Sequence, residues 1–323
     1  MKLSLVLPVH DEAPVIPELV RQLTSVLDEL DGEWEAVFVD DGSRDSSWDL
    51  LQVAAEGDPR IRAIRFSRNF GHQIALSAGL HIATGDAVIT MDSDLQHPPE
   101  LVPALLARAA EGFDVVYAVR SSLDSSPWFK RMSARLFYRL LNRVSSLELP
   151  QAGGDFRYMS RRVVNALLAM PERHRFLRGM TRWVGYEQST IEYHRPPRAG
   201  GASKYTLRKM IALGWDAIVS FSSLPLRVAS LLGFLFSFFG LVYLTYVVAV
   251  RVFSDSTVAG WTSVVATVLV LGGVQLLCIG IIGQYLGRMY EEMKGRPLFL
   301  VADDTARVEA PELSGREESS RRR

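Results

Sequence analysis

Short apolar segments alternate with amphipathic segments through the first 120 residues of the chain. The apolar segments have the length and residue types of buried strands, and they lie at 3–9, 34–39, 61–66, 87–91 and 115–119. The segments between them space their apolar positions as helices do. This alternation predicts βαβ units, and therefore an α/β domain with a parallel sheet covered by helices on both faces.

Two longer apolar runs lie near the C-terminus. Residues 228–250 contain no charged side chain, and neither do residues 256–287. A helix needs about 20 apolar residues to cross a bilayer, so the runs predict a hairpin of two transmembrane helices. Basic side chains are more numerous outside the hairpin than in the short connection at 251–255, which predicts that both of its ends are cytoplasmic. The alternative, a buried hairpin, would need a larger domain around it.

Charge and cysteine content narrow the possibilities. The 36 basic and 36 acidic side chains balance, so no nucleic-acid partner is expected. Cys278, the single cysteine, lies in the second apolar run and excludes a disulfide framework or a thiolate metal cluster. The apolar run at 3–9 is short for a signal peptide, and acidic residues follow it, so we expect the N-terminal domain to be cytoplasmic.

A basic amphipathic helix is expected at 127–147, because basic residues alternate there with apolar residues at helical spacing and no acid intervenes. Near a membrane, such a helix favours anionic head groups, although an ordinary surface helix has the same pattern. The expected organisation is a cytoplasmic domain at 1–205, a membrane-interface helix at 206–227, the hairpin at 228–287, a juxtamembrane segment at 288–301 and a disordered tail at 302–323.

Two carboxylates directly follow the strand expected at 87–91. Asp92 and Asp94 are separated by one residue, and side chains two positions apart on an extended chain point the same way. Such pairs bind Mg²⁺ or Mn²⁺, with substrate phosphates among the remaining ligands. The alternative is a plain turn before Pro98. Because parallel sheets bind ligands beyond the carboxyl ends of their strands, the polar residues at 8–12, 40–43, 68–71 and 92–96 and Arg120 are expected at one rim.

Taken together, five motifs resemble those of a known family. They are Pro8-x-x-x-Glu12, Asp40-Asp41-Gly42-Ser43, Asp92-x-Asp94-x-Gln96, Gly154-Asp155-Phe156-Arg157 and Gly201-x-Ser203-Lys204-Tyr205. With the two apolar runs behind it, this set resembles the polyprenyl-phosphate glycosyltransferases, which are inverting members of glycosyltransferase family 2 with a Rossmann-like GT-A fold. The pattern covers about residues 1–290 and is similar to dolichol-phosphate mannose synthase and to bacterial undecaprenyl-phosphate glucosyltransferases.

The resemblance implies roles for individual residues. It implies a nucleotide-sugar site at Pro8, His10, Glu12, Asp41, Asp92, Arg120, Arg198 and Lys204. It implies a Mg²⁺ or Mn²⁺ site at Asp92, Asp94 and Gln96. It implies an acceptor-phosphate site at Arg157, Arg178 and Ser203, and catalytic roles for Asp94, Asp155 and Arg157. The chain departs from the family at His10-Asp11-Glu12, where Tyr-Asn-Glu is usual, and at Ser93, whose side chain is expected to point away from the metal.

The implied reaction needs no general base. A lipid phosphate is mostly dianionic at neutral pH, since its second pKa is about 6, and it can attack the anomeric carbon directly. Asp155 then has two interpretations: either a base or a sugar-binding acid at the reaction centre, or an acid that orients Arg157 and the acceptor-phosphate site. The chemistry favours the second.

Several hypotheses about function remain. Residues 69–73 and 154–157 look most like the bacterial glucosyltransferases, which favours UDP-glucose; GDP-mannose, UDP-N-acetylglucosamine and an aminoarabinose donor are alternatives. The expected location is the inner cell membrane, with a polyprenyl phosphate as partner and a homo-oligomer as one option. A processive polymer synthase fits less well, because Gly179 replaces a glutamine four residues before Trp183. A non-catalytic scaffold is another alternative, and a transporter of the lipid product is a third, although a transporter would normally have more membrane helices.

Overall fold

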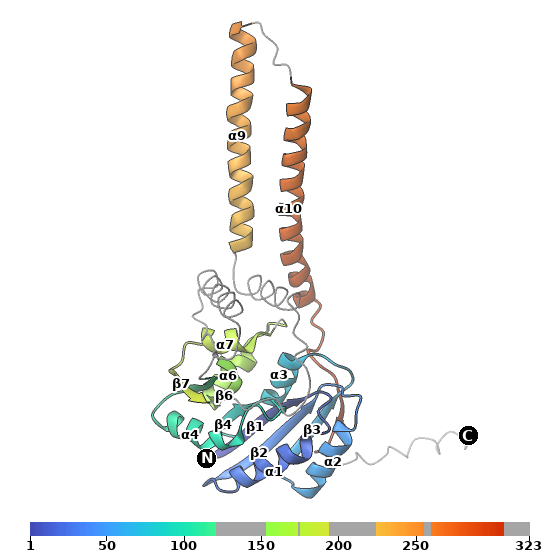
Figure 1. Cartoon of the computed structure of the whole chain (residues 1–323), viewed down its shortest axis with the longest axis vertical. Coiled ribbons are helices and arrows are strands. Elements are labelled where there is room, and N and C mark those ends of the chain that lie inside the picture. Colours follow the sequence, from blue (N-terminus) through green and yellow to red (C-terminus); the bar gives the residue numbers. More distant parts are fainter. Residues whose placement is uncertain (121–152, 174, 194–223, 255–259, 307–323) are drawn as a thin grey trace, which may run out of the picture. The chain divides into compact units, whose positions relative to one another are not determined.

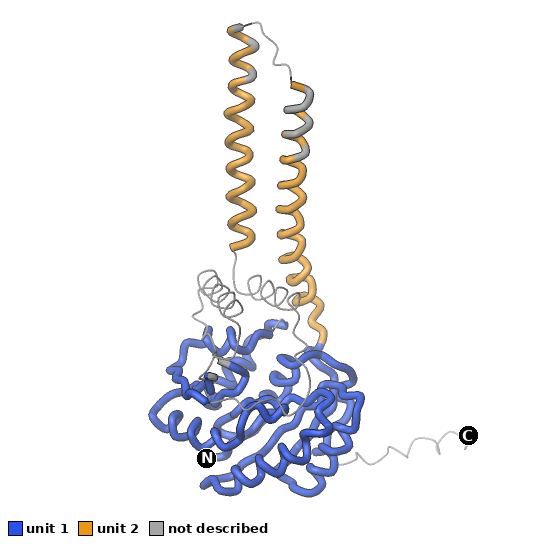
Figure 2. Tube along the Cα trace, viewed as in Figure 1, with its two compact units in different colours: residues 1–132, 149–203, 297–323 blue, residues 133–148, 204–296 orange. Residues whose placement is uncertain are grey.

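The computed structural model describes residues 1–120, 153–173, 175–193, 224–254 and 260–306. The chain forms two compact units, shown in different colours in Figure 2. The first contains residues 1–132, 149–203 and 297–323, and the second contains residues 133–148 and 204–296. The expected amphipathic helix at 127–147 and all but the last four residues of the expected interface helix at 206–227 lie outside the described residues.

An eight-stranded sheet is the centre of the first unit (Figure 1), with the strand order β7-β5-β6-β4-β1-β2-β3-β8. The strands are β1 (Lys2–Val9), β2 (Glu33–Asp40), β3 (Ile61–Phe66), β4 (Ala87–Thr90), β5 (Val115–Arg120), β6 (Gly153–Ser160), β7 (Gln188–Tyr193) and β8 (Val301–Asp304). β1 pairs in parallel with β2 and β4, and β2 pairs in parallel with β3. The α/β class expected from the alternating pattern is confirmed.

The five expected strands, β1 to β5, run in one direction as expected, but two strands that the local pattern did not predict make the sheet mixed. β6 lies between β4 and β5 and runs antiparallel to both, and β8 runs antiparallel to β3. Both strands reach the sheet through long stretches of chain instead of the short helical crossovers that join β1 to β4. Their direction therefore depends on long-range connections, which the local apolar pattern does not contain.

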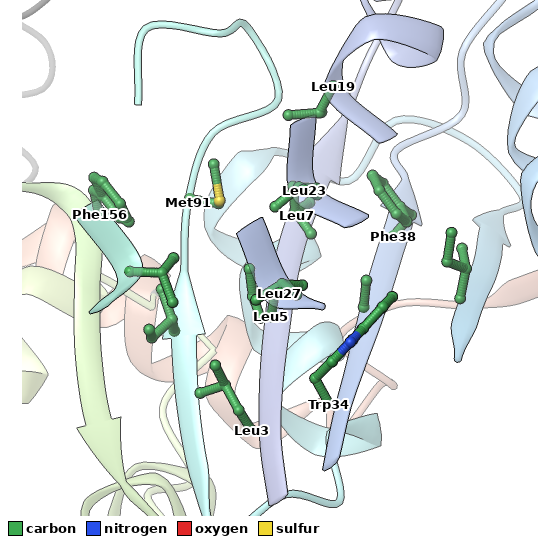
Figure 3. Close-up of a cluster of buried hydrophobic side chains, with 14 of the residues drawn as sticks. Leu3, Leu5, Leu7, Leu19, Leu23, Leu27, Trp34, Phe38, Met91 and Phe156 are labelled. Carbon is green, nitrogen blue, oxygen red and sulfur yellow. The ribbon is translucent and has the colours of Figure 1, made fainter. Parts of the chain in front are cut away.

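Helices complete the first unit. They are α1 (Ile16–Leu27), α2 (Ser47–Gly57), α3 (His72–Ile82), α4 (Val102–Ala110), α6 (Arg161–Ala169) and α7 (Leu177–Trp183), with a 3₁₀ turn at Pro99–Leu101 before α4. α1 forms because its apolar residues recur every three or four positions, and its buried face consists of Ile16, Leu19, Leu23 and Leu27. Figure 3 shows leucines of α1 over Leu5 and Leu7 of β1 in the main core. Each fully buried leucine contributes about 1.5–3 kcal/mol.

Two long helices make up the described part of the second unit. α9 spans Leu224–Ser254 and α10 spans Trp261–Met293, and the two helices contact each other. Both are long and apolar enough to cross a membrane, over Leu224–Val250 and Val270–Met293. Large apolar side chains along both helices are exposed, as lipid-facing side chains would be. α10 continues six residues past the expected end of the hairpin at residue 287.

The chain after the hairpin returns to the first unit as β8. Asp304 pairs with Ile64 of β3, and the backbone N–H of Thr305 donates to the carbonyl of Ala63. The expected disordered tail from residue 302 is therefore wrong for residues 302–306, while residues 307–323 lie outside the described part. The short, polar β8 sequence has no strand pattern of its own. It is ordered because the open edge of β3 supplies hydrogen-bond partners.

Candidate active site

The carboxyl ends of β1, β2 and β4 bring three predicted motifs together. Pro8 lies in β1, and its carbonyl accepts a hydrogen bond of 2.8 Å from the Ser93 hydroxyl. Ser93 is buried, so its side chain points into the domain as expected from the strand geometry. The backbone N–H of Asp41 donates to the carbonyl of Val9 over 2.8 Å, which joins the second motif to the first. The rim expected from strand ends is present.

Asp92 and Asp94 lie in a constrained turn at this rim. The Asp92 backbone N–H donates to Nδ1 of His97 over 2.9 Å, and Oδ1 of Asp94 accepts from the backbone N–H of Gln96. Leu95, which lies between Asp94 and Gln96, has a φ of 56°, a left-handed conformation that a leucine rarely adopts. Such strain persists where the surrounding structure imposes it, as it often does at binding sites.

One atom of this turn suits a cation. Oδ1 of Asp92 is buried and has no hydrogen-bond partner within the described residues. A buried carboxylate oxygen without a donor is costly unless a ligand or an ion satisfies it. Because Mg²⁺ and Mn²⁺ prefer carboxylate and amide oxygens, Asp92, Asp94 and Gln96 have the chemistry of the expected metal site.

Asp155, in β6, is the centre of a buried polar cluster. Its Oδ1 accepts from Nη2 of Arg157 over 2.8 Å and from Nε of Arg178 over 3.1 Å. Its Oδ2 accepts from Nη2 of Arg178 over 2.9 Å and lies 3.2 Å from Nε2 of His72. We call Asp155, Arg157, Arg178 and His72 the Asp155 cluster. Burial opposes ionisation of Asp155, but the charge of Arg178, the hydrogen bond from His72 and the charge of Arg157 hold its pKa well below the usual range.

Arg157 is held in place by the residues around it. Arg157 is 1% exposed, and its Nη1 donates to the hydroxyl of Thr181 over 3.1 Å. Arg178 comes from α7, so this short helix supplies both the partner that fixes Arg157 and a second guanidinium. Two guanidinium groups therefore face one carboxylate, and of the two only the Arg178 side chain is partly exposed.

His72 joins the cluster to the turn formed by Asp92, Asp94 and Gln96, which we call the acidic turn. It is the first residue of α3, and its Nε2 lies 3.2 Å from Oδ2 of Asp155 and 3.5 Å from Oδ1 of Asp92. Burial alone would lower the pKa of His72, but the hydrogen bond to Asp155 and the charge of Asp92 raise it above the ordinary value. We assigned His72 no role from the sequence, although its position directly after the rim segment 68–71 was a usable signal.

His72, Asp92 and Asp155 also offer ligand atoms within 4.8 Å of one another, as a metal site would. Asp155, however, already faces two guanidinium groups, whose charge opposes a divalent cation at the same carboxylate. The acidic turn is therefore the better place for a cation, with Asp92 as the ligand that both candidate sets share.

Asp41 faces the backbone of residues 68–71, which we call the donor loop. Its Oδ1 accepts from the Phe70 N–H over 2.6 Å, and its Oδ2 accepts from the Gly71 N–H over 2.9 Å. Burial is the largest influence on Asp41 and raises its pKa despite these hydrogen bonds. Gly42, with a φ of 67°, allows the close approach, since a Cβ there would lie 2.6 Å from the carbonyl carbon of Arg68. Asp41 thus shapes the donor loop through its side chain.

His10 and Glu12 lie beside this loop. Nδ1 of His10 is 3.1 Å from the carbonyl oxygen of Asp41, and 45% of the His10 side chain is exposed. The Glu12 backbone N–H donates to the hydroxyl of Ser47 over 3.0 Å, which holds the end of this motif against α2. Asp11 adopts a φ of 54° between them. The His10 ring thus lies at the rim with nearly half of its surface exposed.

Four residues of the expected site are not placed. Arg120 is the last residue of β5, but its side chain lies outside the described part. Arg198, Ser203 and Lys204 fall within 194–223, which is also outside it. The described structure therefore brings together the acidic turn, the donor loop and two of the three expected acceptor-phosphate residues.

Comparison with known proteins gives two family matches. The model described as glycosyl transferase family 2 matches residues 4–168, and the model described as the GtrB C-terminal hairpin matches residues 224–289. These matches cover the domain with the rim and the pair of long helices, respectively. The α/β domain of the GT-A type expected from the motifs is confirmed.

Relatives match along most of their length. The chain is 43% identical to an uncharacterized glycosyltransferase of Bacillus subtilis (strain 168), with 92% of each chain covered. It is 39% identical to the bactoprenol glucosyl transferase of Shigella phage SfX, over 93% of this chain and 99% of that one. It is 38% identical to the prophage bactoprenol glucosyl transferase homolog of Escherichia coli (strain K12), over 93% and 98%. The chain therefore belongs to glycosyltransferase family 2 and is a glycosyltransferase with a C-terminal helical hairpin.

Proposed function

We propose that this enzyme transfers glucose from UDP-glucose to a polyprenyl phosphate at the cytoplasmic face of a membrane, with inversion at the anomeric carbon. The observation that carries the proposal is the contact of the Asp155 cluster with the acidic turn: His72 lies 3.2 Å from Asp155 and 3.5 Å from Asp92. A cation-binding group thus lies next to an anion-binding group. The proposed reaction requires both groups, because a phosphate attacks a sugar whose diphosphate leaving group is bound to a metal.

The donor would bind at the rim. We assign Asp92, Asp94 and Gln96 to the metal and Pro8, His10, Glu12 and Asp41 to the border of the base and ribose, with Arg120, Arg198 and Lys204 as further donor contacts. The buried Oδ1 of Asp92, which makes no hydrogen bond within the described residues and lies 3.5 Å from Nε2 of His72, supports the metal assignment. Bound Mg²⁺ or Mn²⁺ would neutralise charge on the leaving diphosphate.

The acceptor phosphate would bind at Arg157 and Arg178, with Ser203 as a further contact. Asp155 holds both guanidinium groups in place, and its low pKa keeps it ionised at neutral pH. The phosphate oxygen forms the new bond to the anomeric carbon, and the bond from that carbon to the diphosphate oxygen breaks. A dianionic phosphate has no proton to lose, so Asp155 acts by orienting the arginines and not as a base.

A membrane location follows from the same proposal. α9 and α10 have the length and composition of spanning helices, and a polyprenyl chain needs a lipid phase. The matches to the bactoprenol glucosyl transferase of Shigella phage SfX and to its prophage homolog in Escherichia coli each cover 93% of this chain, which supports a lipid acceptor. The excess of basic residues outside the hairpin supports the part of the proposal in which both of its ends are cytoplasmic.

The test is a transfer assay on the full chain in membranes. Undecaprenyl phosphate would be incubated with radiolabelled UDP-glucose, UDP-N-acetylglucosamine or GDP-mannose, and the labelled lipid would be identified. We expect transfer from UDP-glucose that requires added Mg²⁺ or Mn²⁺. Asp49→Ala, which removes an exposed acid from α2, is the matched control for Asp94→Ala. Absence of transfer from every donor would leave the scaffold hypothesis in place.

A further inference from the structure

Residues that follow the hairpin contact the strand that leads into the donor loop. The Phe299 ring stacks on Phe66, with ring centroids 5.1 Å apart and an interplanar angle of 21°. Beside this contact, the Ser67 backbone N–H donates to the carbonyl of Leu300 over 3.0 Å. β8 then continues along β3, and Arg62 donates to both carboxylate oxygens of Asp304. The segment is therefore anchored at Phe299 and at the residues that follow it.

Phe66 contacts both Phe299 and Phe70 of the donor loop. It is the last residue of β3 and is 1% exposed, and its ring meets the edge of Phe70 with centroids 5.5 Å apart. Phe70 is the residue whose N–H donates to Oδ1 of Asp41 over 2.6 Å. The three aromatic rings form a continuous row from the post-hairpin segment to the rim.

The donor loop depends on such external support. It contains no helix or strand, and it ends at Gly71, whose φ of 103° is accessible mainly to glycine. Its outer face carries the Arg68 guanidinium over the Phe70 ring at 4.0 Å, and Asn69 Nδ2 lies 3.3 Å from the His10 ring nitrogens. A shift of Phe70 would therefore move the groups that border His10 and Asp41.

We propose that Phe299 is a positioning residue for the nucleotide sugar. By stacking on Phe66 it fixes Phe70, and through Phe70 it sets the donor loop against the side chain of Asp41 and the ring of His10. The inference rests on the proposed function, because it assumes that a nucleotide binds at this part of the rim. It adds that a residue beyond the membrane hairpin controls donor affinity.

The test compares three variants of the full chain in detergent. Phe299→Leu keeps an apolar side chain but removes the stacked ring, Phe299→Tyr keeps the ring, and Leu300→Ala changes the neighbouring exposed side chain, which is the matched control. UDP binding in the presence of Mn²⁺ would be measured by calorimetry. KM would be measured separately for UDP-glucose and for undecaprenyl phosphate, and the melting temperature of each variant would be recorded.

For Phe299→Leu we expect the Kd for UDP and the KM for UDP-glucose to rise about 3- to 10-fold, the effect of losing one aromatic pair. The KM for the lipid and the values for Phe299→Tyr and Leu300→Ala should stay within about twofold of the wild type. A merely structural role would lower the melting temperature and the active fraction but leave Kd and both KM values unchanged, and that result would overturn the inference. If the wild type did not bind UDP, the proposed function itself would fail.

Discussion

Nη2 of Arg157 donates to Oδ1 of Asp155 over 2.8 Å at a point where both side chains are almost completely buried. Burial lowers the pKa of Arg157, and the charge of Asp155 opposes that effect. Each residue therefore supplies the charge that makes burial of the other tolerable. This mutual dependence makes Asp155 a structural partner of the arginines. An orienting acid and a catalytic base should therefore respond differently to substitution of Asp155.

Asp155→Asn should keep measurable turnover. The amide preserves the shape of the side chain but leaves the buried Arg157 without a counter-charge, so we expect a loss of about 3 kcal/mol in stability. The KM for undecaprenyl phosphate should rise more than tenfold, because both arginines lose their orientation. Kinetic assays at saturating UDP-glucose, with a melting curve for each protein, measure both effects. Asp49→Asn is the control; complete loss of turnover in a folded Asp155→Asn protein would instead identify Asp155 as a base.

Asp94→Ala should abolish transfer while the protein stays folded. The side chain belongs to the acidic turn and is partly exposed, so its removal should cost little stability. The variant should also bind Mn²⁺ at least tenfold more weakly in the presence of UDP, which paramagnetic resonance of the ion can measure. Full activity of Asp94→Ala, or wild-type activity in excess chelator, would rule out this metal site.

Gly42→Ala should destabilise the first unit. A Cβ at this position would lie 2.6 Å from the Arg68 carbonyl carbon and 2.7 Å from the Asn69 nitrogen, and the φ of 67° adds strain of about 1–2 kcal/mol. We expect a fall in melting temperature and a weaker affinity for UDP, because the donor loop must move. Gly57→Ala is the matched control, since a Cβ there meets nothing within 4 Å. Equal melting temperatures for the two variants would contradict this account of Gly42.

Stability should fall in acid through Glu35. Burial opposes ionisation of Glu35, but hydrogen bonds from Lys2, Ser4 and Thr84 outweigh it and lower its pKa from 4.5 to about 2. Because the folded pKa is lower than the unfolded one, the stabilisation is fully present above pH 4.5 and is lost as the pH falls towards 2. Glu35→Gln should therefore be less stable than the wild type by about 1–2 kcal/mol at pH 7.

The measurement for Glu35 is thermal unfolding of both proteins between pH 7 and pH 3, followed by tryptophan fluorescence. The difference in melting temperature should shrink as the pH falls below 4.5. Glu33→Gln, at an exposed position two residues earlier in β2, is the control and should track the wild type. A difference that grew in acid would have the wrong sign for this mechanism.

Removal of residues 301–323 should destabilise the sheet, whereas removal of residues 307–323 should not. The longer deletion removes β8 and the ion pair of Arg62 with Asp304, and it exposes the edge of β3. We expect a lower melting temperature and aggregation for the longer deletion, measured by light scattering during heating. Equal behaviour of the two truncated proteins would show that β8 contributes nothing to the domain.

The local pattern of the sequence was enough to locate the first five strands and the long helices. The expected strand at 61–66 is the observed β3, and the expected strand at 34–39 lies within β2, because apolar alternation is a property of neighbouring residues. The acidic turn and the rim were also predictable, since they follow strand ends in the chain. The motifs as a set indicated the family.

Tertiary structure alone decided the rest. The insertion of β6 between β4 and β5 and the pairing of β8 with β3 join segments far apart in the sequence, and no local periodicity records such pairings. The same holds for the Asp155 cluster, in which His72 precedes Asp155 by 83 residues and Arg178 follows it by 23. A charged side chain has the same sequence pattern whether it faces water or a buried partner. Only the folded chain determines which charges share an interior.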